Sequence, residues 1–352
     1  MIHSKQYDGA VATLNRLNDC DNISPLQSFE IGWLYGRARH FSEALRIFKS
    51  VPEDVPDRQS HRYAVALSTF EIADYRSTVE ELKPLEAEGS LNAESANLLG
   101  VSYSKLRLYQ RAQSTLVQEI QRNRDDLPAY LNLVTLYADQ DMFAEAAKVA
   151  SQAVEVFPQF AEVFIVRGAA NTLLGQLDKA HEDFRSASSL SPDKADPRFF
   201  LALTEYKQGK FSDAINSLRS AIGSGIADAD LHYLLAECLL KVDGIKKQDI
   251  MNELDRAIEL NANSVSARVL RGKLLLDSGH PREGAEDLEV AHQHDPSSRS
   301  AAYNLARAYQ ALGRTDESQL LFSHFRSQTA DGITELGDRR LTNALSENGS
   351  RP

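Results

Sequence analysis

The sequence predicts an all-α protein in which pairs of helices stack one after another as an α-solenoid. Residues 161–194 carry the clearest pair: apolar and small residues recur at helical spacing, break at Gly175, and recur again until Pro192. The same pattern returns every 34 residues along the chain. No stretch sustains the two-residue alternation that a β-strand would show between turn signals. One pair cannot bury its own apolar face, so we expect neighbouring pairs to bury it together.

A small residue recurs on the first helix of each predicted pair. Antiparallel helices approach closely only where a side chain is small, so we expect the second helix to contact this position. The position holds Gly or Ala in eight of nine repeats: Gly32, Ala66, Gly100, Val134, Gly168, Ala202, Ala236, Gly272 and Ala306. On the second helix a large apolar residue recurs with the same period: Phe48, Leu82, Leu116, Phe184, Leu218, Leu254, Leu288 and Phe322.

This pattern resembles the tetratricopeptide repeat family, whose helix-turn-helix motif carries Gly or Ala, Tyr, Ala, Phe, Ala and Pro at matching offsets. Tyr35, Tyr103 and Pro192 stand at the Tyr and Pro offsets. The resemblance implies a right-handed superhelical α-solenoid whose first helices line a concave groove, and it implies no particular ligand. It covers Pro25 to Gly332 as nine repeats: 25–58, 59–92, 93–126, 127–160, 161–194, 195–228, 229–264, 265–298 and 299–332, with two extra residues in the seventh.

Residues 1–24 begin in the middle of the repeat pattern. Lys5 to Asn18 align with a second helix whose first helix is absent, so an apolar face with Leu14 and Leu17 lacks its partner. Burying each such side chain is worth about 1.5 to 3 kcal/mol, so we expect this face to be covered. Three arrangements satisfy it: the natural chain extends upstream, another chain covers the face, or the segment packs on repeat one as an N-terminal cap.

Residues 333–352 leave the repeat register, because Arg340 would occupy the small position of a tenth first helix. Leu336, Leu341 and Leu345 fit one more helix together with Ile333, and we expect this capping helix to cover repeat nine. Arg339 and Arg340 should then face water. Ser346 to Pro352 are expected to be a disordered tail.

Composition restricts the function and the compartment. A net charge of −11 argues against nucleic acid, because phosphate binding needs a basic stripe. No apolar run reaches the length of a membrane span, so we expect no membrane insertion. Cys20 and Cys238 lie in distant parts of the chain and are read as free thiols, which suits a reducing compartment. We expect a cytoplasmic protein by default, and a periplasmic or secreted one if an export signal lies upstream.

The sequence shows no constellation of catalytic residues. It contains no phosphate loop, dinucleotide fingerprint, nucleophile elbow or paired-cysteine metal motif. His292 and His294 beside Asp295 are the nearest approach to metal ligands, but a spacing of two residues is poor for one metal on a helix. We therefore predict no catalytic residue, no metal and no cofactor.

The resemblance implies that the second, fifth, ninth, twelfth and thirteenth residues of each repeat face the concave groove. Aromatic and apolar residues at such positions are typical anchors for a bound peptide. The predicted ligand-binding residues are Phe29, Trp33, Tyr63, Phe70, Asn97, Leu131, Ile165, Phe199, Tyr206 and Tyr233. Second positions add an acidic margin, which would suit a ligand with flanking Lys or Arg: Glu94, Glu162, Asp196 and Asp230.

These observations predict a non-enzymatic scaffold that binds a peptide or partner protein in its groove. The Lys and Asn set with which chaperone-binding members of the family hold a carboxylate is not matched, since Asn132 and Asn304 stand in distant repeats. An alternative is a self-assembly or architectural module, in which the unpaired N-terminal half repeat docks on another copy. A catalytic role would need a cluster or cofactor that the sequence does not show.

Overall fold

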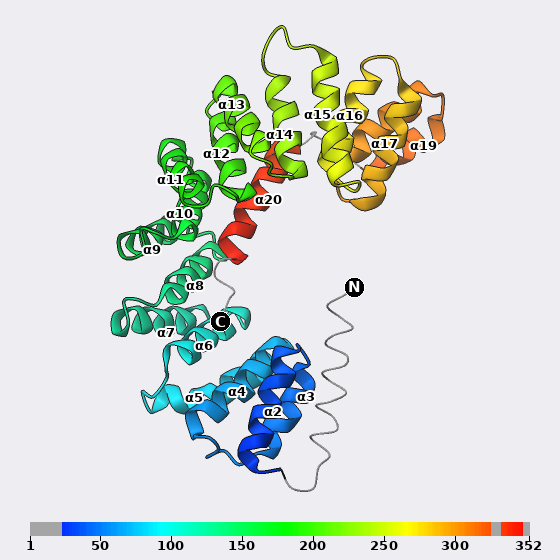
Figure 1. Cartoon of the computed structure of the whole chain (residues 1–352). Coiled ribbons are helices and arrows are strands. Elements are labelled where there is room, and N and C mark those ends of the chain that lie inside the picture. Colours follow the sequence, from blue (N-terminus) through cyan, green and yellow to red (C-terminus); the bar gives the residue numbers. More distant parts are fainter. Residues whose placement is uncertain (1–22, 325–331, 348–352) are drawn as a thin grey trace. The chain divides into compact units, whose positions relative to one another are not determined.

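The computed structural model describes residues 23–324 and 332–347, which contain nineteen helices and no strand (Figure 1). The predicted fold class, an all-α solenoid of stacked helix pairs, is confirmed. The half repeat, Cys20 and the tail beyond residue 347 lie outside the described residues. The helices are α2 (Pro25–Arg37), α3 (Phe41–Ser50), α4 (Arg58–Glu71), α5 (Tyr75–Ala87), α6 (Ala93–Lys105), α7 (Tyr109–Arg122), α8 (Leu127–Ala138), α9 (Phe143–Val156), α10 (Ala161–Leu173), α11 (Leu177–Leu190), α12 (Ala195–Lys207), α13 (Phe211–Gly223), α14 (Ala229–Leu239), α15 (Lys247–Leu260), α16 (Val265–Leu276), α17 (Pro281–His294), α18 (Arg299–Ala311), α19 (Thr315–His324) and α20 (Gly332–Glu347).

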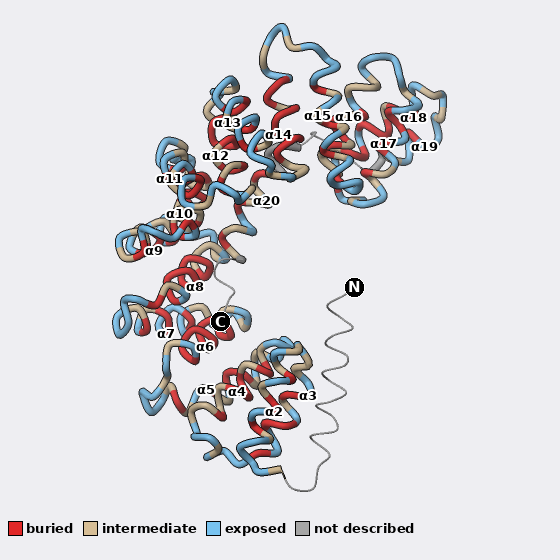
Figure 2. The backbone as a smooth tube through the Cα atoms, in the orientation of Figure 1, coloured by how far each residue is buried: buried red, intermediate tan, exposed pale blue. Residues whose placement is uncertain are grey.

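The chain divides into two compact bodies. Among the described residues, the first body comprises residues 23–156 and 347, and the second body comprises residues 157–324 and 332–346. Within each body, from α2 to α9 and from α10 to α19, every helix packs against the next one, and some successive first helices also touch, as α12 touches α14 and α16 touches α18. Figure 2 shows the buried residues concentrated on the helix faces that meet inside each body. First helices therefore lie side by side at these points, and a second helix packs against the first helix on either side of it, as α13 does with α12 and α14.

The small first-helix position is where the second helix packs closest. A Cβ atom built on Gly168 would lie 2.8 Å from a ring atom of Phe184, and one built on Gly32 would lie 2.5 Å from Phe48. Both distances are too short for two carbon atoms, so only glycine allows these helices to approach this far. Leu116 and Leu288 fill the same space above Gly100 and Gly272. The contact predicted between the two repeating positions is confirmed.

The tight turn after each first helix has one residue in the left-handed region. The first body places residues with side chains there: Arg39, Ala73, Arg107 and Asp141, with φ between 57° and 64°. The second body places glycine at the matching position in four repeats: Gly175, Gly209, Gly279 and Gly313. The longer turn after α14 has Gly244 in the left-handed region, five residues after the helix ends. A side chain in this region costs on the order of 1 kcal/mol, whereas glycine adopts it without strain. The tight turn is thus the same in eight repeats, although its residue type changes between the bodies, and only the longer turn after α14 departs from it.

Candidate functional site

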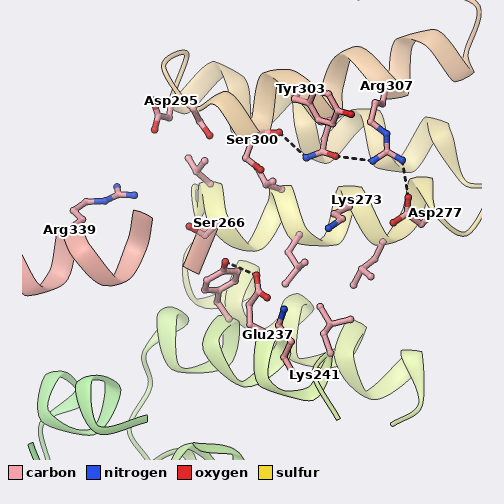
Figure 3. A pocket seen from close by; sticks show the side chains of 18 residues that line it. Glu237, Lys241, Ser266, Lys273, Asp277, Asp295, Ser300, Tyr303, Arg307 and Arg339 are labelled. Atoms are coloured by element: carbon pink, nitrogen blue, oxygen red, sulfur yellow. Dashed lines mark hydrogen bonds and ion pairs between the residues drawn. The ribbon is translucent and has the colours of Figure 1, made fainter. Parts of the chain in front are cut away.

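An open groove lies on the last three first helices of the second body, α14, α16 and α18 (Figure 3). Its volume is about 620 Å³. Successive turns of each helix supply the lining, because residues three to four positions apart share one helix face. The residues that line the open groove include Tyr233, Glu237, Leu240, Lys241, Val269, Lys273, Asp277, Tyr303, Arg307 and Arg339.

Two apolar side chains of the open groove remain available to a ligand. Tyr303 is 39% exposed and Leu240 is 37% exposed, whereas Tyr233 and Val269 are buried beneath the surface of the groove. The ring of Tyr303 packs edge-on against Phe322 of α19, with ring centroids 5.9 Å apart. This contact holds the tyrosine in one orientation, so little side-chain entropy would be lost when a ligand packs on it.

The charges in the open groove are mixed, and two of the cations are unpaired. Arg307 donates to Asp277 and to Asn304, each at 3.1 Å, so its charge is already balanced (Figure 3). Among the described residues, the exposed ammonium groups of Lys241 and Lys273 form no hydrogen bond or ion pair. Because an exposed ammonium pairs readily with a carboxylate, these lysines can accept an acidic group from a ligand.

Sequence reasoning missed these basic residues. Lys273 and Arg307 occupy the ninth position of their repeats, and Lys241 occupies the thirteenth, so all three stand at positions already expected to face the groove. The predicted contact residues included aromatic and acidic residues at these positions but no basic ones. The signal was therefore present in the register, since a basic residue appears at a groove position in each of repeats seven, eight and nine.

A second region of the same helix layer carries helix α20. We call it the covered face: Asp196, Phe199 and Leu203 of α12, with Asp228 and Asp230 at the start of α14. Arg340 of α20 donates to Asp230 at 2.8 Å and to Asp196, and it lies 3.4 Å from an oxygen of Asp228. The guanidinium also sits 4.2 Å from the centre of the Phe199 ring, at the distance of a cation–π contact.

The fit between α20 and the covered face is close. A Cβ atom built on Gly337 would lie 2.8 Å from a methyl carbon of the buried Leu203, so a larger residue would push the two helices apart. Leu336, Leu341 and Leu345 of α20 are all buried. Asp338 accepts from Lys207 at 3.3 Å and adds an ion pair at the edge. Leucine burial and charge pairing thus act together on this helix.

The prediction that Arg340 faces water is wrong. Its side chain is only 14% exposed and lies among three carboxylates of repeats six and seven. The expectation that this helix covers repeat nine is wrong as well, because Gly337 and Arg340 meet α12 and the start of α14, in repeats six and seven. The register gives the place of the helix along the chain and not the repeat that receives it. The prediction for Arg339 is met in one respect, because this residue is exposed, and it lies at the border of the open groove. The side chain of Ile333 is outside the described residues.

Burial and charge shift the pKa values at the covered face in a consistent way. Burial raises the pKa of Asp230 above its ordinary value, and the neighbouring charge of Arg340 opposes that rise. Burial alone would lower the pKa of Arg340, but Asp228, Asp196 and Asp230 together raise it. Arg340 and the carboxylates therefore stabilise one another, whereas the charge of Asp228 adds to the rise in the pKa of Asp230.

The predicted groove residues of the second body differ widely in exposure. Ile165 and Tyr206 are half-buried, and Glu162 is exposed on α10. Tyr206 packs edge-on against Phe211, with ring centroids 5.3 Å apart. Phe199 and Tyr233 are almost completely buried, Phe199 with Arg340 above its ring and Tyr233 with its hydroxyl donating to Glu237 at 2.9 Å.

In the first body, three of the predicted aromatic residues keep some exposed surface. Trp33, Tyr63 and Phe70 are half-buried, and the rings of Trp33 and Tyr63 lie 6.2 Å apart. Burial raises the pKa of the Tyr63 hydroxyl, and the nearby charge of the exposed Glu94 adds to the rise. Trp33, Tyr63 and Glu94 thus lie near one another, and the ring of Phe70 packs edge-on against Tyr75.

Three predicted groove residues of the first body are buried between neighbouring helices. Phe29 is 5% exposed, Asn97 is 2% exposed and Leu131 is 8% exposed. Asn97 donates to Asp126 at 2.8 Å and accepts from Asn132 at 2.9 Å, which ties α6 to α8. Because these side chains already pack inside the body, we leave all three out of the proposed contact surface.

The described residues form neither a metal-binding cluster nor a membrane-spanning helix. Over residues 23–324 and 332–347, no three His, Cys, Asp or Glu side chains come together in a group that could hold a metal ion. Within the same ranges no helix has both the length and the apolar character to cross a membrane. Cys238 is a free, buried thiol, and burial raises its pKa to about 12.

Comparison with known proteins identifies a family. The model of the family described as the C-terminal domain of cilia and flagella-associated protein 70 matches residues 58–311, which is more than half of the chain. Among curated proteins, tetratricopeptide repeat protein 8 of Caenorhabditis elegans is 22% identical, over 64% of this chain and 45% of its own length. BBSome complex member BBS4 of Bos taurus is 22% identical, over 58% of this chain and 41% of its own length. The chain spans less than half the length of these relatives.

Solved structures support the fold. A tetratricopeptide repeat protein from Parabacteroides merdae superposes with a TM-score of 0.54 at 17% identity, covering 71% of this chain and 98% of the other. At this identity the similarity concerns the fold alone. It agrees with the stacked helix pairs described above.

Proposed function

The chain belongs to the tetratricopeptide repeat family represented by the C-terminal domain of cilia and flagella-associated protein 70, and from this premise we propose that it holds a segment of a partner protein in its open groove. Proteins of this family are, in general, scaffolds for protein–protein interaction. The finer proposal is that repeats seven to nine supply the contact, and that the chain acts by binding rather than by catalysis.

The observation that carries this proposal is the pairing of exposed apolar side chains with unpaired cations in one groove. Tyr303 and Leu240 offer apolar contact, and Lys241 and Lys273 offer charge. Apolar anchors supply most of the affinity of such a contact, and charges select the partner and its orientation. The expected ligand is a segment with an apolar side chain flanked by Asp or Glu.

This expectation differs from the one that the acidic margin suggested. Asp196 and Asp230 already bind Arg340, so they do not leave an acidic rim for a basic ligand while α20 is in place. The carboxylates of the open groove already accept hydrogen bonds, Glu237 from Tyr233, Asp277 from Arg307 and Asp295 from Ser297, whereas Lys241 and Lys273 donate none among the described residues. The ligand that complements the open groove therefore carries acidic rather than basic flanking residues.

One relative supports a protein partner. The Bos taurus relative is named as a member of the BBSome complex, so that protein works within an assembly of several chains. We extend only the general feature, a protein partner, to this chain. In the first body we propose Trp33, Tyr63 and Phe70, with Glu94 beside them, as further contact residues, because half-buried aromatic side chains can anchor a ligand.

A peptide display selection tests the proposal. The full chain is offered random peptides of 16 residues, and enriched peptides are measured by fluorescence anisotropy. We expect dissociation constants in the micromolar range, about 8 kcal/mol of binding free energy, and enrichment of Asp or Glu beside an apolar residue. The double substitution Tyr303→Ser and Leu240→Ser should weaken the selected peptides at least tenfold.

The matched control is Leu260→Ser on α15, because Leu260 is 40% exposed but does not line the open groove. This variant should bind the selected peptides as the unaltered chain does. Peptides that bind all three proteins equally would remove the open groove as the contact surface. Enrichment of basic peptides would contradict the proposed charge selection.

A further inference from the structure

We propose that α20 is an intramolecular ligand of the covered face, and that it competes there with a partner helix carrying an arginine among leucines. The proposal concerns a different surface from the open groove, which α20 borders only through Arg339, and it does not depend on the ligand of the open groove. It commits to one kind of external occupant, an amphipathic helix with the chemistry of α20.

The acids of the covered face alone would not point to a ligand. Asp196 and Asp230 stand in the first turns of α12 and α14, where a negative charge stabilises the helix by itself. Asp228 is the N-cap of α14 and accepts from the backbone amides of Asp230 and Leu231. Each acid therefore has a reason to be there without any partner.

The position of Arg340 is a second observation, separate from the acids themselves, that indicates a binding site. Arg340 enters between α12 and α14, meets one acid from the start of each helix, and stacks on the Phe199 ring (14% of its side chain remains exposed). An aromatic floor with carboxylates around it is a specific environment for a planar guanidinium. The covered face thus recognises arginine by shape as well as by charge.

The rest of α20 meets the groove positions of repeat six. Phe199 and Leu203 are the fifth and ninth residues of that repeat, and Gly337 packs directly on Leu203. α20 therefore occupies the surface at which the family resemblance implies ligand contact. An amphipathic helix laid on apolar groove residues is also a recurrent way of binding a partner.

Occupation by α20 must weaken any competing ligand. When a binding-competent state is populated only in part, the apparent dissociation constant rises in inverse proportion to that population. If α20 is docked in 99% of the molecules, a competing helix binds about 100-fold more weakly than it would to the free face. Loosening α20 should restore that affinity.

The test uses a fluorescein-labelled synthetic peptide of residues 332–347 and the full chain. The peptide is titrated, by fluorescence anisotropy, with the unaltered chain, with Arg340→Ala, and with Gly337→Leu. Both substitutions weaken the intramolecular contact and leave the covered face unchanged, so both should bind the peptide at least tenfold more tightly than the unaltered chain. A peptide carrying R340A should lose at least tenfold in affinity for the same two variants.

Two controls keep the outcome interpretable. Arg219→Ala removes an exposed arginine of α13 and should leave peptide affinity unchanged. Circular dichroism should show that both α20 variants keep their helical content. If neither folded variant binds the peptide more tightly than the unaltered chain, or if the R340A peptide binds as well as the original, the proposal is overturned.

Discussion

The covered face and the open groove are built from the same repeat positions on neighbouring first helices, but they differ at the second position of the repeat. Repeats six and seven place Asp196 and Asp230 there, whereas repeats eight and nine place Ser266 and Ser300. The two acids hold Arg340, and α20 lies over them. The two serines line the open groove instead.

The two regions differ in whether the side chain at the fifth position of the repeat is exposed or covered by α20. Phe199 and Tyr303 both occupy the fifth position, yet Phe199 is completely buried and Tyr303 is 39% exposed. Their apolar character is similar, so it does not explain the difference. For this pair the difference lies with Arg340, which covers the Phe199 ring and is held by the acids one helical turn away, whereas the serines carry no charge that would hold such a cation. Helix α14 takes part in both regions, with its first turn at the covered face and its later turns at the open groove.

The largest expected effect concerns the core that supports the covered face. Phe184 fills the space above Gly168 and stacks on Phe200, with ring centroids 5.1 Å apart. Phe184→Ala should therefore lower the free energy of unfolding by about 3–5 kcal/mol, measured by urea denaturation followed by circular dichroism. Phe160→Ala, at a site 40% exposed, should lose much less. A loss of under about 1 kcal/mol at Phe184 would contradict the packing described here.

The next effect tests the acids that distinguish the two regions. The double substitution Asp196→Ser and Asp230→Ser makes repeats six and seven resemble eight and nine, so α20 should detach more often. We expect the docking of α20 to weaken by about 2 kcal/mol, allowing for the exposure of Asp196. Limited trypsin digestion after Arg339 and Arg340 should accelerate correspondingly.

Asp193→Ser is the control for that pair, because Asp193 is an exposed acid just before α12. Digestion at α20 should proceed at the original rate in this variant. Equal rates in the unaltered chain and in the double variant would show that the acids do not hold α20.

A smaller effect separates the charge preferences of the two regions. Lys241→Glu with Lys273→Glu should weaken acidic peptides selected on the open groove about tenfold, or about 1.4 kcal/mol. The same variant should bind the peptide of residues 332–347 as the unaltered chain does, because these lysines do not touch Arg340 or its acids. A parallel loss for both peptides would mean that the two regions are one site. Anisotropy titration measures both.

The smallest expected effect is on Cys238. This thiol shares the buried face of α14 with Leu231 and Leu235, and burial raises its pKa to about 12. Alkylation by iodoacetamide in a Cys20→Ser background should be slow and should rise about tenfold per pH unit below pH 12, since only the thiolate reacts. Arg340→Ala should leave the rate unchanged. Acceleration would show that losing the arginine loosens α14 as a whole.

Much of the fold could be predicted from the sequence, because close helix packing requires small residues at fixed intervals. Gly32, Gly100, Gly168 and Gly272 each meet the large side chain that the register assigned to them. The groove positions of repeats seven to nine also followed from the register. The register could not predict which groove positions would be exposed. Asn97 and Leu131 fit the register as well as Tyr303 does, but they are buried.

The docking of α20 could not be predicted from the sequence. The spacing of Leu336, Leu341 and Leu345 indicates an amphipathic helix but does not say which surface receives it. Arg340 and Asp196 are 144 residues apart, and many acids along the chain would have been equally plausible partners. Only the structure identifies which carboxylates meet the arginine.

Amide hydrogen exchange along α20 tests the central claim most directly, because a docked helix protects its backbone and a detached one does not. In the unaltered chain the amides of residues 336–345 should exchange on the order of 100-fold more slowly than in the isolated peptide of residues 332–347, which corresponds to docking in about 99% of molecules. Arg340→Ala should remove most of that protection. Exchange in the unaltered chain as fast as in the isolated peptide would contradict the account.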